Sequence, residues 1–90
     1  MINSNVVRAV DEALKSHNVK PRTGERLGDT VARALHISGS EAERWLEALS
    51  EGCTVEEANN RAGIINDVEN QSILTAVARA IGAIMGKMSG

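Results

Sequence analysis

Apolar residues recur at spacings of three and four along most of the chain, and polar or turn-forming residues separate the segments that show this pattern. Such spacing places the apolar side chains on one side of a helix. The expected helices, counted from cap to stop, cover about residues 5–17, 24–35, 38–52, 54–63 and 67–88. No segment alternates as a strand would. The pattern therefore predicts an all-α fold for residues 1–90, a single compact bundle of about five helices with a long C-terminal helix.

Local signals support several of these boundaries. Ser38 with Glu41, and Thr54 with Glu57, have the form of capping boxes, in which a hydroxyl and a carboxylate satisfy free backbone amides at a helix start. Asn66 is expected to cap the last helix. Glycines that follow the third and fourth helices allow the left-handed turn that ends a helix.

Composition agrees with a helical, cytoplasmic protein. The apolar fraction is 42%, rich in Ala and without Phe or Tyr, which suits closely packed helices better than a sheet. A single Cys excludes an intramolecular disulfide. The chain begins without a secretory signal, and its longest apolar stretch, residues 73–85, is too short to span a bilayer and contains Arg79. Association with a second copy would bury more apolar surface in so small a chain.

Charge is unevenly distributed along the sequence. The net charge is −2, but residues 1–38 carry +2, residues 39–70 carry −6 and the last twenty carry +2. A polyanion would therefore have to meet the N-terminal third of the chain. The acidic middle would suit a partner protein with a basic surface, although acidic helices often have nothing more than a solvated face.

Residues 30–49 carry a pattern of small and apolar residues around a turn. Ala32 is the small residue of the first helix, Leu35, His36 and Ile37 form the turn, and apolar residues of the second helix follow at Ala42, Trp45 and Leu46. This segment resembles the helix-turn-helix unit of bacterial and phage DNA-binding proteins. Residues 54–64 resemble the start of a second such unit, with Asn59 at a position where that family has a small residue.

The resemblance implies that the second helix of the unit enters the major groove of duplex DNA. Its exposed positions include three Glu and one Arg, which is an acidic set for a DNA-reading helix. Phosphate contacts would therefore come mainly from bases upstream of it. The candidate DNA-contact residues are Lys20, Arg22, Arg26, Arg33, Ser40 and Arg44. Trp45 is expected to belong to the core.

The last helix offers a candidate self-association surface. Its apolar residues step by three and four, as in a coiled-coil seam, and a stripe of small residues runs beside them. The candidate residues are Leu74, Val77, Ile81, Gly82, Ile84, Gly86 and Met88. In the alternative interpretation this seam is intramolecular core covered by the first helix. The tail is also similar to the C-terminal helix of type III secretion needle subunits, which implies an assembly role.

No pattern for catalysis, a metal or a cofactor is present. Cys53 has acidic neighbours and no nearby His, and His17 and His36 are not at metal-ligand spacing. We therefore expect that the protein is not an enzyme.

Two hypotheses for function remain. The first is a small prokaryotic or phage regulatory protein that docks the helix-turn-helix on duplex DNA, with a homodimer through the last helix as a further expectation. The alternative is a protein-interaction or assembly module that uses the acidic 39–70 surface or the C-terminal helix. A basic face built from the candidate DNA contacts would favour DNA. An exposed face dominated by Glu41, Glu43 and Glu47 would favour the interaction module.

Overall fold

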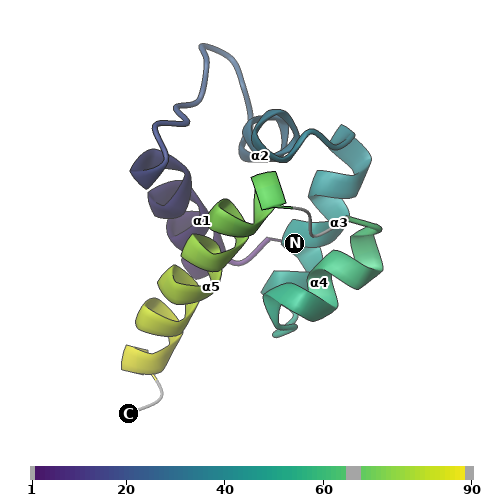
Figure 1. Ribbon diagram of the computed structural model, residues 1–90. Helices are drawn as coiled ribbons and strands as arrows, with labels where there is room; N and C mark the ends of the chain where they lie inside the picture. Colours follow the sequence, from purple (N-terminus) through teal and green to yellow (C-terminus); the bar gives the residue numbers. More distant parts are fainter. Residues whose placement is uncertain (1, 65–67, 89–90) are drawn as a thin grey trace.

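The computed structural model describes residues 2–64 and 68–88, with the side chains of residues 69 and 85–88 outside the description. Five α-helices cover most of this part of the chain, and it contains no strand (Figure 1). They are α1 (Ser4–Ser16), α2 (Leu27–Leu35), α3 (Gly39–Ser50), α4 (Val55–Ala62) and α5 (Val68–Met88). The predicted all-α bundle is confirmed. The expected cap at Asn66 lies outside the described residues.

The helix starts follow the local signals in the sequence. The Ser38 hydroxyl accepts the Glu41 amide at 3.2 Å, and the Glu41 carboxylate accepts the Ser38 amide at 2.9 Å. Thr54 and Glu57 form the same reciprocal pair, both bonds being 3.1 Å. Both predicted capping boxes are therefore confirmed.

Helices α1 to α4 all end in the same way. The residue after each helix or after its last turn has a positive φ, and the next amide donates to a carbonyl five residues back, as in a Schellman motif. The left-handed residues are Asn18, His36, Gly52 and Gly63, and the donors that follow are Val19, Ile37, Cys53 and Ile64. Each donor also packs its apolar side chain on or in the core. The chain direction after each helix is thus fixed by a hydrogen bond and an apolar contact.

His36 adopts the left-handed conformation that its place in the turn predicted, with φ 58 and ψ 46. A side chain with a Cβ is strained there, whereas Gly is not. We expect His36→Gly to raise the free energy of unfolding by about 0.5–1 kcal/mol, after allowing for the greater freedom of Gly in the unfolded chain. Urea unfolding measures the change. The reciprocal variant Gly63→Ala should lower stability, because Gly63 has φ 74; a loss of stability in both variants would contradict the strain argument.

Trp45 lies at the centre of the core. Its side chain is fully buried, and its indole Nε1–H donates to the Asn59 Oδ1 at 2.8 Å. Asn59, at the position where the resemblance called for a small residue, is itself buried and gives α4 a polar anchor on α3. Ala58 and Ala62 of α4 belong to the same core cluster. Trp45 is therefore a core residue, as expected.

The helices at the two ends of the described chain pack on one another. The interface between α1 and α5 is the most extensive in the fold, and Figure 1 shows the two helices side by side. Leu74 and Val77 are buried in the core, at 4% and 0% exposure. This corrects their assignment to a dimer interface, because the chain itself covers them. At these two positions the apolar seam of the last helix is part of the intramolecular core, as in the alternative interpretation.

The other candidate self-association residues are less enclosed. Ile81 and Ile84 are half-buried, and Gly82 is exposed, with no described atom beyond its chain neighbours and its own helix backbone within 4 Å of the position that a Cβ would occupy. Gly86 and Met88 lie outside the described side chains. Their role in a dimer stays a prediction.

Candidate interaction surface

The exposed side of α3 is acidic. Its buried side consists of Ala42, Trp45, Leu46, Ala48 and Leu49. Helical geometry therefore leaves Ser40, Glu43, Arg44 and Glu47 on the solvent side, and all four are exposed. Among the described residues, neither Glu43 nor Glu47 takes part in an ion pair. We call Glu43 and Glu47, one helical turn apart, the acidic face of α3.

Further carboxylates extend this charge beyond the acidic face. Glu51, Glu56 and Glu57 are exposed, and within the described part of the chain only Glu51 of these three pairs with a base, the Arg61 guanidinium at 2.9 Å. The backbone amides of Ser38 and Thr54 lower the pKa of Glu41 and Glu57, respectively. These two side chains are used in helix caps. They stay ionised near neutral pH and add to the negative potential.

Arg33, one of the candidate DNA-contact residues, forms hydrogen bonds within the protein. Its Nη2 donates to the Lys20 carbonyl at 2.7 Å and to the Glu25 Oε1 at 3.0 Å, and its Nε donates to the Glu25 Oε2 at 3.2 Å. We call this arrangement the clasp, because it ties the loop from Asn18 to Arg26 onto α2. Its Nε and Nη2 atoms are engaged with Glu25 and Lys20, so these two atoms are not available for the predicted phosphate contact.

Glu25 is the centre of the clasp. It also accepts the Arg22 amide at 2.9 Å and the Thr30 hydroxyl at 2.9 Å. The hydrogen bonds from Arg33, followed by the bond from the Arg22 amide, lower the pKa of Glu25 to about 2. The carboxylate is thus ionised throughout the neutral range and holds four donors from two sides.

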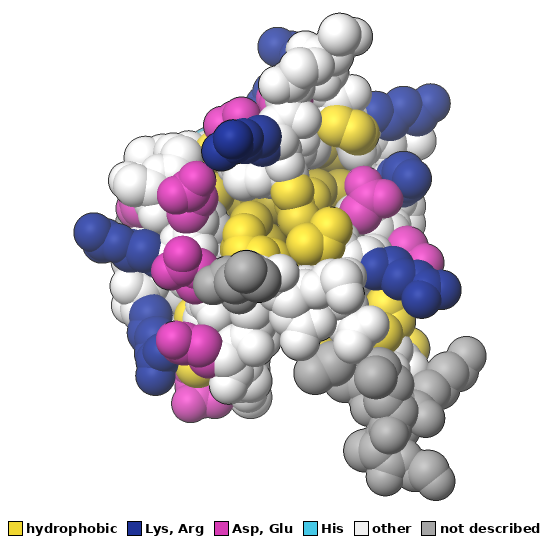
Figure 2. Space-filling view, turned by 180° about the vertical axis from the view of Figure 1, so that it is seen from behind, with side chains coloured by type: hydrophobic (Ala, Val, Ile, Leu, Met, Phe, Trp, Pro, Cys, Tyr) yellow, Lys and Arg dark blue, Asp and Glu magenta, His cyan; other side chains and the backbone are white. Residues whose placement is uncertain are grey.

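The candidate DNA-contact residues do not form one basic face. Lys20, Arg22 and Arg26 are exposed on the loop before α2, whereas Ser40 and Arg44 lie on α3 beside the acidic face. Figure 2 shows basic side chains dispersed around the rim of one side of the molecule, with acidic side chains between them. This distribution of charge fits the expectation for an interaction module better than the expectation for DNA binding. Glu43 and Glu47 are exposed on α3, while Glu41 is used as a cap.

An apolar groove that the sequence did not predict lies between α1 and the loop before α2. It has a volume of about 280 Å³ and is lined by Ser4, Val7, Arg8, Asp11, Pro21, Glu25, Leu27 and Thr30. Figure 2 shows hydrophobic side chains gathered in a hollow on this side of the molecule, with acidic side chains to both sides of it. Val7 was the available signal, since it lies outside the apolar stripe of α1 and is 37% exposed.

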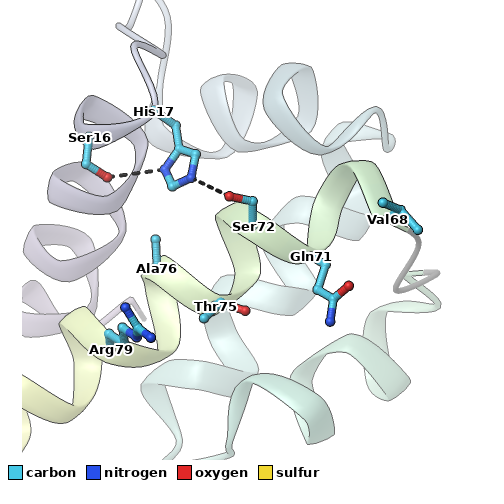
Figure 3. Close-up of a pocket in the computed structure, with 8 residues that line it drawn as sticks. All are labelled: Ser16, His17, Val68, Gln71, Ser72, Thr75, Ala76 and Arg79. Carbon is cyan, nitrogen blue, oxygen red and sulfur yellow. Dashed lines mark hydrogen bonds between the residues drawn. The ribbon is translucent and has the colours of Figure 1, made fainter.

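A second groove, of about 670 Å³, separates the end of α1 from the first half of α5. His17 bridges it: Nε2 lies 2.9 Å from the Ser72 hydroxyl, and Nδ1 lies 3.2 Å from the Ser16 hydroxyl (Figure 3). Nδ1 also lies 3.2 Å from the Ala13 carbonyl. The ring nitrogens therefore face hydroxyl and carbonyl oxygens. This contact joins α1 to α5.

Comparison with protein-family models, with curated proteins and with solved structures finds no match to the chain. Within the described residues, no three His, Cys, Asp or Glu side chains lie close enough together to hold a metal ion. The helices of that part of the chain also include none with the length and apolar character needed to cross a membrane.

Proposed function

We propose that the protein is a non-enzymatic interaction module that binds the basic surface of a partner protein through the acidic face of α3. One observation carries this proposal: Glu43 and Glu47 are exposed on one side of a rigid helix and have no ion-pair partner among the described residues. The buried side of the same helix contains the fully enclosed Trp45. Carboxylates held in this way present their charge without the entropic cost of ordering a loop.

Electrostatics supports a protein partner over a nucleic acid. Residues 39–64 contain six carboxylates and two guanidinium groups, one of which is paired with Glu51. An acidic surface accelerates encounter with a basic partner and repels phosphate. The clasp removes Arg33 from the bases that would offset this charge.

We expect the double variant Glu43→Lys, Glu47→Lys to weaken binding of a helical leucine–lysine peptide by about tenfold or more, since like charges would then face one another. Fluorescence anisotropy of the labelled peptide measures the dissociation constant at low and at physiological salt. The matched control is Glu12→Lys, Glu56→Lys, which changes net charge equally at exposed positions of α1 and α4. An equal loss in both variants would show that only net charge matters and would overturn the proposal.

A second candidate function is DNA binding through α2 and α3. The observation in its favour is the three-residue turn between these helices, with His36 left-handed, because this arrangement resembles the helix-turn-helix family. Titration of duplex DNA at two salt concentrations tests it. Each phosphate neutralised contributes about −0.9 to the slope of log K against log salt. Under the main proposal we expect no salt-dependent binding. A steep slope would support the DNA function instead.

A further inference from the structure

We infer that the apolar groove between α1 and the loop before α2 receives the apolar side of a cationic amphipathic helix from the partner. The inference rests on the proposed function and assigns the mode of binding. An acidic face by itself gives fast encounter and weak, salt-sensitive binding, whereas affinity and specificity come mostly from apolar anchors in a desolvated pocket. The groove is the apolar site that adjoins the acidic face.

The two walls of the groove differ in origin. Ser4, Val7, Arg8 and Asp11 follow the helical spacing of one side of α1, and Leu27 and Thr30 begin α2. Val7 is one of two large apolar side chains exposed in the described part of the chain, the other being Val68. A depression between two helices accepts a third helix by the packing that operates within helical bundles. The shape of the site therefore favours a helical occupant.

The clasp fixes the loop wall of the groove. Glu25 lines the groove and is held by Arg33, by the Arg22 amide and by Thr30, whose side chain is buried. Pro21, on the same loop, restricts the backbone further. A wall held at several points requires little ordering when a ligand enters, which favours binding.

One residue of the acidic face of α3, Glu43, lies close to the α2 end of the groove. Leu27 lines the groove, and at the next residue, Gly28, the position of a Cβ would lie 3.6 Å from the Glu43 Cγ. Figure 2 shows both acidic and basic side chains around the hydrophobic hollow. A helix that lies in the groove and extends towards α3 would place its flanking residues near Glu43. Lysine or arginine beside an apolar stripe is the chemistry that complements this surface.

Charge along α1 also orients such a helix. Arg8 and Asp11 both line the groove, one turn apart, so the α1 wall is basic near its middle and acidic at its C-terminal end. Asp11 is paired with Lys15 at 3.0 Å, but the Lys15 side chain is exposed and that of Asp11 is only half-buried. Partly exposed pairs of this kind are weak and exchange partners easily. The basic flank of the bound helix is expected beside Asp11.

The test compares Val7→Arg with Val68→Arg. Both variants replace an exposed Val on a helix with an Arg, but Val68 lies on α5 and does not line this groove. The probe is the helical leucine–lysine peptide, with a peptide in which Ser replaces each Leu as its control. We expect Val7→Arg to weaken binding of the leucine peptide by about tenfold or more, and Val68→Arg to change it less than about twofold. The Ser peptide should bind weakly to all variants.

A methyl NMR titration of the unmodified protein gives a measurement that does not depend on variant folding. The Val7 methyl resonances should shift on addition of the leucine peptide, and those of Val68 should not. If Val7→Arg and Val68→Arg bind equally while the charge reversal on α3 still weakens binding, the groove assignment is overturned and the proposed function stands. If the unmodified protein binds neither peptide, both fail. A mass that doubles on light scattering, and returns to that of a monomer in Val7→Arg, would assign the groove to a second copy and overturn the partner helix.

Discussion

Trp45→Ala is expected to lower the free energy of unfolding by about 3–5 kcal/mol, the range for removing a large aromatic side chain from a core. Trp45 is the only aromatic residue of the chain and is fully buried between α3 and its neighbours. Domains have a total stability of about 5–15 kcal/mol, so the variant should lose a large share of it. Far-UV circular dichroism during urea unfolding measures the loss.

The hydrogen bond of Trp45 gives a graded control. Asn59→Ala would leave the buried indole N–H without its acceptor and is expected to cost about 1–3 kcal/mol. Trp45→Phe would remove the donor and leave the Asn59 amide oxygen unsatisfied. A loss below about 1 kcal/mol in Trp45→Ala would contradict the central place given to this residue.

The stability that Glu25 contributes through the clasp should be lost in acid, and the part that remains in Arg33→Ala, which lacks the clasp, should be lost at higher pH. Hydrogen bonding lowers the pKa of Glu25 from 4.5 to about 2. A depressed carboxyl pKa contributes stability above its unfolded value, and this contribution is lost as pH falls from about 4.5 through about 2. Without Arg33 the pKa of Glu25 rises towards its ordinary value, so the loss moves to higher pH. Unfolding in urea across this pH range tests the shift, and Glu25→Gln should abolish this part of the pH dependence.

At neutral pH the variant Arg33→Ala should release the loop before α2. Arg22 and Arg26 are exposed trypsin sites on that loop, whereas the bond after Lys20 precedes Pro21 and resists trypsin. We expect Arg33→Ala to speed cleavage there by about tenfold, because cleavage requires local opening. Arg61→Ala is the matched control: its pair with Glu51 is 60% and 66% exposed, and such pairs contribute at most about 1 kcal/mol. Equal cleavage of the two variants would show that the clasp does not hold the loop.

Helix boundaries were predictable wherever a short stretch of sequence determines them. The capping residues at Ser38 and Thr54 and the left-handed turn at His36 act within a few residues and are confirmed. The start of α2 was misplaced by about three residues, to residue 24 instead of Leu27. The cause is local as well: Gly24 has φ 81, and Glu25 is used in the clasp.

The surface was harder to predict, because it depends on contacts between segments. The acidic character of α3 is visible in sequence, since periodicity alone puts Glu43 and Glu47 opposite Trp45. The contacts of Arg33 cannot be predicted in this way, because its partners Glu25 and Lys20 come from the preceding loop. The groove likewise forms only when α1 meets α2, and the sole hint was that Val7 falls outside the stripe. Charge counts by segment could not distinguish engaged bases from exposed ones.

The pairing of α1 with α5 has a consequence for how the chain matures during synthesis. Helix α1, whose buried side contains Val6 and Val10, leaves the ribosome before α5, yet among the described helices it packs most extensively on α5. Until then this side is open to chaperones or to neighbouring nascent chains. The short-range turns after α1 to α4 would already be set at that stage. Completion of the domain therefore waits for the last helix to dock.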